Sequence, residues 1–202
     1  MPSIEPHLTL VSISDLRPTQ ITMGKREVQR KRQGWKAKSE DKASGYLGEH
    51  LVPVVIGPED AYYLIDHHHL ALALHLEGQD KVLVQTVAHL DHLGENEFFR
   101  YMDKRCWLHP FDEKGHRQDP DKLPKTVEGL IDDPFRSLAG ELREAGGFAK
   151  DTTPFSEFMW ADFLRHRIPD HVCAEDPQAA LKLAFTIAKS RAASFLPGWC
   201  GP

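Results

Sequence analysis

The residues with the clearest capacity for chemistry are an aspartate and three consecutive histidines at positions 66–69. They follow residues 62–65, whose aromatic and branched side chains are typical of a strand. The apolar residues after them recur at helical spacing, and Gly78 suits the end of a helix. The sequence therefore predicts a strand, a sharp turn and a helix, with Asp66 as the N-cap and the histidines in the first helical turn.

The first turn of a helix is suited to bind an anion, because it carries free N–H groups and the positive end of the helix dipole. Imidazoles placed there can donate to phosphate, carry protons or bind a metal. Consecutive helical residues point about 100° apart, so at most two of the three histidines can serve one site. In the structural alternative, Asp66 is only a cap and His69 is a buried, hydrogen-bonded core residue. Four such residues at one turn favour a ligand site.

A basic segment at residues 24–38 lies upstream of this turn. It contains seven lysines and arginines and one acidic residue, Glu27. The segment is either a solvated helix or loop, or a positive surface that attracts phosphate, and both interpretations stay open.

Composition limits the class of protein. The chain has 202 residues and a net charge of −5, so its overall charge does not favour nucleic acid or a membrane surface as a partner. Its three cysteines are widely spaced without a CxxC motif, which argues against a disulfide framework and fits a reducing compartment. We expect no signal peptide, because residues 1–16 lack a basic segment followed by a long apolar one, and no apolar run reaches about 20 residues. We therefore expect a cytoplasmic protein with no membrane partner.

The remaining pattern predicts an α/β (α+β) fold, with a small mixed sheet and a helical C-terminal half. Strands are expected at residues 8–13, 51–57 and 81–88, with 51–65 as a hairpin and Pro53 at an edge or at the start of its strand. The strands on either side of the histidine helix are expected to pair in parallel. A helix is expected at 91–106, and three more follow the capping pairs at 133–134, 153–154 and 176–177. A long loop at 107–125 and a tail held by Trp199 complete the prediction.

Several motifs together resemble the ParB/sulfiredoxin superfamily over residues 8–90. They are LRPTQ at 16–20, the basic segment, VPVVI at 52–56 and YLIDHHHLALAL at 63–74. Through DDPFRSLAG at 132–140 and LPGWCGP at 196–202, the whole chain resembles a narrower, uncharacterised family, the Putative ParB-like nucleases. The resemblance implies a ParB/sulfiredoxin-like domain at 1–95 and a helical region at 96–202 packed on it.

The resemblance also implies a site. In the superfamily the first turn of the strand–turn–helix element binds nucleotide phosphates, and members include ATP-dependent sulfinic reductases, free-serine kinases and CTP-binding partition proteins. Asp66, His68 and His69 would accordingly occupy the site. Kinase members use an acidic residue from the preceding helix, and Glu27 is its nearest counterpart here. No cysteine lies in the motif, which argues against sulfiredoxin chemistry.

Two positions depart from the superfamily motif. A glycine often follows its acidic residue, where this chain has His67, and Leu70 replaces its arginine. Loss of that arginine removes a bidentate phosphate contact. Phosphate binding would then use His67 with another cation, for which the candidates are Arg30, Lys31 and Arg136.

Three functions fit these residues. The first is a phosphotransferase or hydrolase acting on a nucleotide or phosphorylated small molecule, with Asp66 as base or Mg²⁺ ligand and the histidines as acid, base or donors. The sequence does not identify a cofactor, and the candidate is a nucleoside triphosphate with Mg²⁺. The second is a metal-dependent nuclease, although adjacent histidines are a weak metal signal and no metal site is predicted. The third is a non-catalytic nucleotide-binding or DNA-binding module. In each phosphate-binding case, His68→Ala is expected to abolish binding with little loss of thermal stability.

Overall fold

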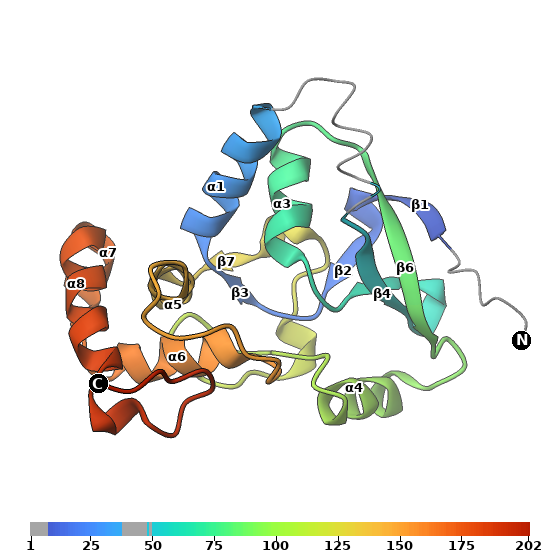
Figure 1. Cartoon of the computed structure of the whole chain (residues 1–202). Coiled ribbons are helices and arrows are strands. Elements are labelled where there is room, and N and C mark those ends of the chain that lie inside the picture. Colours follow the sequence, from blue (N-terminus) through green and yellow to red (C-terminus); the bar gives the residue numbers. More distant parts are fainter. Residues whose placement is uncertain (1–7, 38–47, 49) are drawn as a thin grey trace, which may run out of the picture. The chain divides into compact units, whose positions relative to one another are not determined.

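The computed structural model describes residues 8–37, 48 and 50–202 (Figure 1). The chain forms two compact units. The first contains the residues up to Thr22 together with 28–112 and 116–131, and the second contains 23–27, 113–115 and 132–202. The fold is mixed α/β, as predicted, whereas the domain boundary at residue 95 stays a prediction. Within the described part of the chain, no helix is long and apolar enough to span a bilayer.

The first unit is built on a five-stranded mixed sheet. Its strands, in spatial order, are β1 (Leu8–Ser12), β6 (Lys81–His89), β4 (Val52–Ile56), β5 (Tyr62–Leu64) and β2 (Leu16–Pro18). β4 pairs in parallel with β6 and β2 with β5, whereas β1 with β6 and β4 with β5 are antiparallel. A separate two-stranded sheet joins β3 (Thr22–Met23) and β7 (Ile131–Asp132).

The predicted hairpin at 51–65 is confirmed, because β4 and β5 are antiparallel neighbours joined by a 3-10 turn at Pro58–Asp60. The prediction for Pro53 was wrong: it is the second residue of β4, which lies between β5 and β6. Pro53 still takes part in the sheet through its carbonyl, which accepts a bond from the Ile65 N–H at 3.1 Å. A register irregularity follows at Val54 and Val55.

The predicted parallel pairing across the histidine helix was also wrong. Helix α3 (His68–Leu76) connects β5 to β6, but β4 lies between these two strands and runs antiparallel to β5. The parallel partner of β6 is β4. The hairpin reverses the chain direction before α3 begins. The parallel connection therefore runs from β4 to β6 and contains both β5 and α3.

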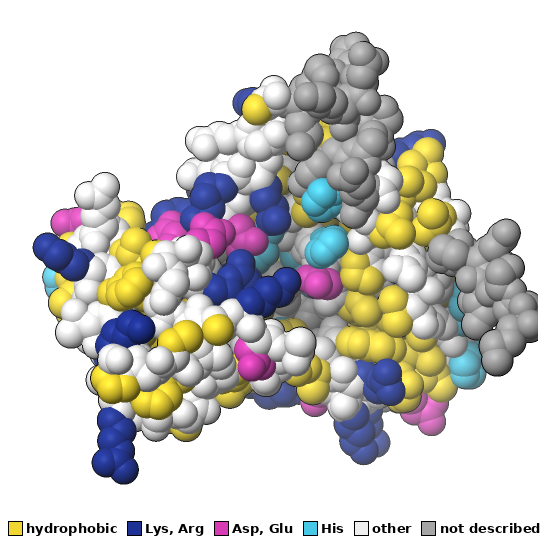
Figure 2. All heavy atoms as spheres, in the orientation of Figure 1, with side chains coloured by type: hydrophobic (Ala, Val, Ile, Leu, Met, Phe, Trp, Pro, Cys, Tyr) yellow, Lys and Arg dark blue, Asp and Glu magenta, His cyan; other side chains and the backbone are white. Residues whose placement is uncertain are grey.

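Helices flank this sheet (Figure 1). Helix α4 (Glu95–Lys104) packs Phe98 and Met102 into a cluster with Val55 and Tyr63. Helix α3 is apolar and buried along most of its length. Helix α1 (Lys25–Lys36) is paired with α3 through Arg32, whose Nε lies 2.6 Å from a carboxylate oxygen of Glu77. Apolar side chains on β1 and β6 remain exposed (Leu8, Leu10 and Val87). Figure 2 shows hydrophobic side chains gathered on the surface over the sheet.

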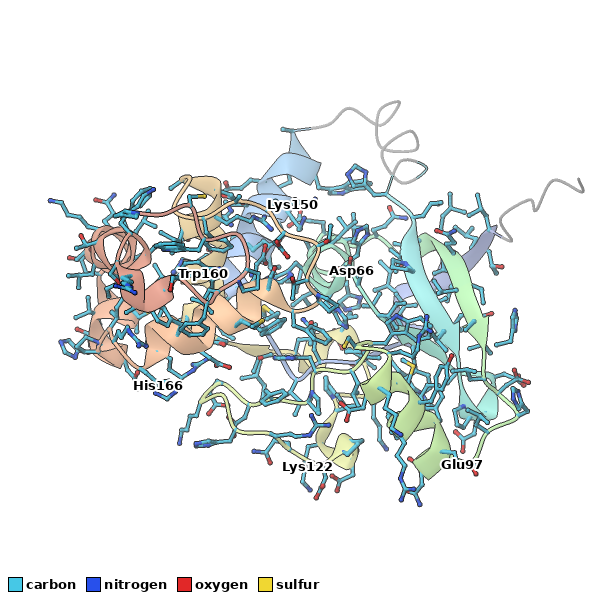
Figure 3. The ribbon with its side chains drawn as sticks, turned by 60° about the horizontal axis from the view of Figure 1, so that its bottom comes forward. Asp66, Glu97, Lys122, Lys150, Trp160 and His166 are labelled. Carbon is cyan, nitrogen blue, oxygen red and sulfur yellow. The ribbon has the colours of Figure 1, made fainter. Side chains whose placement is uncertain are left out.

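The second unit is helical. It contains α5 (Pro134–Glu144), α6 (Ser156–Arg165), α7 (Asp170–Glu175) and α8 (Pro177–Ala188) around a core that includes Trp160, labelled in Figure 3. Asp133 and Asp176 cap α5 and α8, as predicted. Trp199 holds the tail, since its Nε1 donates to the Ala188 carbonyl at 2.9 Å.

The predicted helix start at 153–154 was wrong. Helix α6 begins at Ser156, after Phe155, which has a φ of 58°. Thr153 contributes its carbonyl to the Ser156 N–H rather than a side-chain cap. The short helix α7 was not predicted, because it has no clear capping pair.

Candidate functional site

The turn before α3 differs from its prediction in one respect. His67, not Asp66, is the N-cap, and it has the left-handed backbone conformation φ 65°, ψ 23°. Asp66 is exposed, and its Oδ1 accepts from the His67 N–H at 2.6 Å (Figure 3). The left-handed residue turns the chain between Asp66 and the helix, so the carboxylate does not cap the first turn. No side-chain hydrogen bond from the N-cap closes this end of α3.

The left-handed conformation of His67 fits the glycine that the resemblance implies at this position. Glycine adopts a positive φ without cost, whereas another residue costs roughly 1–2 kcal/mol there. Histidine is among the residues that adopt it more often than most. His67 therefore keeps an imidazole at the helix start at some cost in backbone energy.

The His67 ring is partly buried, and its Nδ1 is fully buried without a hydrogen-bond partner among the described residues. Burial lowers the pKa of His67, and the charges of Lys31 and His50 lower it further, while Asp66 opposes them. The ring is therefore held neutral beside a lysine charge. A neutral imidazole with one unused nitrogen can donate to, or accept from, a ligand. Histidine side chains reach the surface on the face of the molecule drawn in Figure 2.

His68 has a different environment. Its side chain is 4% exposed, and its Nε2 accepts from the Thr19 N–H at 3.2 Å. Burial, with a smaller effect of His69, lowers the pKa of His68 to about 3, and a backbone hydrogen bond with Leu64 opposes this. Since both ring nitrogens are engaged and the ring is neutral, His68 is placed to hold the turn rather than to transfer protons. We now expect His68→Ala to lower stability, contrary to the expectation from sequence.

Two residues of the LRPTQ segment belong to the same environment and were missed as site residues. Thr19 Oγ1 donates to the Leu64 carbonyl at 2.7 Å, so Thr19 ties the end of β2 to the turn both through this bond and through His68. Gln20 is 6% exposed, and its Nε2 has no partner among the residues described. The motif resemblance was the only sequence signal for these two positions, because no local periodicity marks them.

The other predicted residues fall into two groups. Arg30 and Lys31 lie on α1 in the first unit, with Asp66 and the three histidines, of which His69 is also buried. Glu27 and Arg136 lie in the second unit. Among the residues that the structure describes, there is no group of three or more histidine, cysteine, aspartate or glutamate side chains arranged to hold a metal ion.

Arg136 is part of a buried ion-pair network. It is 6% exposed, and its Nη1 lies 3.5 Å from a Glu27 carboxylate oxygen. It also pairs with Glu157, which in turn pairs with Arg143. The guanidinium lies 5.1 Å from the centre of the Phe158 ring. Removal of one partner from a buried ion pair is costly, because it leaves a buried charge uncompensated.

Comparison with known proteins assigns the family. The family model described as Putative ParB-like nuclease matches residues 9–166, which include the sheet, the α3 turn and helices α5 and α6. The chain belongs to this family. The Putative ParB-like nuclease assignment confirms the resemblance drawn from the motifs.

The chain is similar to a solved structure, which is described as the crystal structure of protein Atu1540 from Agrobacterium tumefaciens. The two are 51% identical, with a TM-score of 0.91, and the match covers 98% of this chain and 100% of the other. No curated protein matches the sequence.

Proposed function

We propose that the turn at residues 66–69 binds the phosphate of a nucleotide or of another phosphorylated ligand. The observation that supports this most directly is the buried Nδ1 of His67, which has no partner at a helix start without a side-chain cap. The Lys31 charge acts on the same ring. Backbone N–H groups at a helix start, a neutral imidazole and a lysine are together well suited to a phosphate.

Each residue of the turn then has a separate role. His67 donates one hydrogen bond to the phosphate, and Lys31, with Arg30 beside it in sequence, supplies positive charge. His68 and Thr19 hold the turn in place. Asp66 is the exposed carboxylate, and we propose it as the base for phosphoryl transfer or hydrolysis. Arg136 is proposed as structural, because its charge is paired with two glutamates.

Binding can be tested by titration calorimetry and thermal denaturation with ATP, CTP, ADP and inorganic phosphate, with and without Mg²⁺. A nucleotide at about 100 times its Kd should stabilise the protein by about 2.7 kcal/mol. Lys31→Gln should weaken binding about tenfold, because a charged hydrogen bond is worth about 1.5–3 kcal/mol.

Lys36→Gln is the matched control, since it removes the same charge from the same helix. Lys36 pairs with Glu77 at 3.2 Å, and Glu77 keeps Arg32 as a partner in the variant. This control should bind as the wild type does. Equal affinity of the wild type and Lys31→Gln, or no binding of any phosphate compound, would exclude the proposed site.

A metal-dependent nuclease is the second candidate, and the description of the family favours it. Asp66 and His67 are the residues of the turn that could take part in metal binding. Stabilisation by Mg²⁺, Mn²⁺ or Zn²⁺ without nucleotide, together with cleavage of DNA that Asp66→Asn abolishes, would favour this function over phosphate binding alone.

A further inference from the structure

Basic and aromatic side chains alternate at the end of α4, away from the α3 turn in sequence. Arg100, Tyr101, Lys104, Arg105 and Trp107 fall within eight residues. Residues 100, 101, 104 and 105 share one side of the helix, because neighbours three and four apart lie on the same face. All four are exposed, whereas Phe98 and Met102 face the core. Cations interleaved with rings are absent from the basic helix α1, whose only aromatic residue is Trp35.

The way in which α4 ends brings the last aromatic side chain back to this stripe. Cys106 follows the helix in a left-handed conformation, with φ 54°. The Trp107 N–H donates to the Met102 carbonyl at 2.9 Å, and the Cys106 N–H donates to the Asp103 carbonyl at 3.0 Å. This is a Schellman motif, in which glycine is the usual left-handed residue.

The reversal brings the Arg105, Tyr101 and Trp107 side chains together, with the two rings edge to face. The Arg105 guanidinium lies 4.7 Å from the centre of the Trp107 ring and 6.0 Å from that of Tyr101. The two ring centres are 6.2 Å apart. Tyr101 is 40% exposed, so its ring is available at the surface. The end of α4 is therefore an aromatic platform bordered by cations.

A cavity of about 500 Å³ shares Arg100 with this platform. Helix α4 can be found in Figure 3 by the label of Glu97, which does not line the cavity. Phe99 and Leu108 contribute apolar surface, and Arg100 lines it from the stripe. Four carboxylates also line it: Glu95, Asp103, Asp119 and Asp121. Asp103 is paired with Arg117 at 2.8 Å. Carboxylates repel phosphate but accept hydrogen bonds from the amino groups of bases such as cytosine.

We infer that this surface binds single-stranded nucleic acid. The phosphates lie along Arg100, Lys104 and Arg105, one base stacks on Tyr101, and the cavity takes an amino-bearing base. Base stacking on aromatic side chains beside a cationic groove is the usual way to hold an unpaired strand. A membrane surface would use the cations and rings but not a cavity lined with carboxylates. The inference is independent of phosphate binding at the α3 turn.

The test is fluorescence anisotropy of labelled oligo(dC), oligo(dT) and duplex DNA on the full chain, at several salt concentrations. Oligo(dC) should bind at least fivefold more tightly than oligo(dT) or the duplex, since a good base contact is worth about 1–3 kcal/mol. The double variant Arg100→Gln/Lys104→Gln should reduce the slope of log K against log salt by about 1.4, which is about 0.7 for each cation. Tyr101→Ala should weaken binding about tenfold, and Tyr101→Phe should restore it.

Lys81→Gln/Lys125→Gln removes two exposed cations elsewhere in the first unit and should leave binding unchanged. The inference is overturned if no oligonucleotide binds, if the control double variant loses as much affinity as Arg100→Gln/Lys104→Gln, or if oligo(dC), oligo(dT) and the duplex bind equally. Binding to anionic lipid vesicles without binding to oligo(dC) would also overturn it, and would assign the stripe to a membrane surface.

Discussion

The starts of α3 and α5 carry similar signals in the sequence, yet their local structures differ. At α5, Asp133 is 1% exposed, caps the Phe135 N–H at 2.9 Å, and pairs with the Arg165 guanidinium at 2.8 Å. At α3, the acidic residue is exposed, the N-cap side chain makes no capping bond, and the buried Nδ1 of His67 has no partner among the residues described. The Asp133 carboxylate at the α5 start is satisfied within the protein, whereas we propose that the polar groups of the α3 start bind a ligand.

This difference shows why an acidic residue before a helix is a poor guide to function. The same signal marks a stabilising cap where an arginine neutralises it, and a candidate site where the backbone turns it outward. Two arginines of the second unit are also paired with carboxylates of that unit, namely Arg136 and Arg165. An unsatisfied buried polar atom adds a second signal, because it costs free energy that a ligand can recover.

The largest expected effect is at the α5 start. Asp133→Ala should destabilise the protein by about 3–5 kcal/mol, because it removes a cap and leaves the mostly buried Arg165 without its strongest partner. Asp176→Ala, which removes an exposed cap at α8, should cost only about 1 kcal/mol. Urea denaturation measures both. Equal losses in the two variants would show that the Asp133–Arg165 pair adds nothing to capping.

An intermediate effect is expected at His68 and depends on pH. The pKa is about 3 in the folded protein and 6.5 in the unfolded chain, so only the unfolded chain binds a proton between these values. Stability should therefore fall as the pH is lowered from 6.5, with a slope approaching 1.4 kcal/mol per pH unit. Between about pH 7 and about pH 5 the wild type should lose roughly 2 kcal/mol more than His68→Gln, measured by urea denaturation. Parallel pH profiles for the two proteins would mean that His68 titrates normally and is not part of the buried turn.

The smallest effect on stability is expected at His67. His67→Gly should leave the free energy of unfolding unchanged or raise it by about 1 kcal/mol, because glycine relieves the left-handed strain. Affinity for phosphate compounds should nevertheless fall severalfold, as calorimetry would detect. His67→Asn, which tolerates the same backbone conformation and keeps a donor, is the control. A marked loss of stability in His67→Gly, with binding intact, would make the α3 start structural like that of α5.

Much of the local structure could be predicted from sequence. The Asp-Pro pairs located α5 and α8, and the turn residues after Ile56 located the β4–β5 hairpin. The apolar stripe of α5 identified core residues, since Phe135, Leu138, Ala139 and Leu142 are all buried. The motifs indicated the family, which the family model confirms. These features could be predicted because capping, turn chemistry and helical periodicity depend on residues close together in the chain.

The properties of the candidate site depended on residues far apart in sequence. The sequence by itself determined that an aspartate and three histidines would stand at a strand-to-helix turn, with cationic residues upstream. Only the tertiary structure made His67 the left-handed N-cap, gave His68 a buried neutral ring bound to Thr19, and placed the Lys31 charge near His67. The reason is physical: burial and electrostatic environment are set by neighbours in space, and 49 residues separate Thr19 from His68.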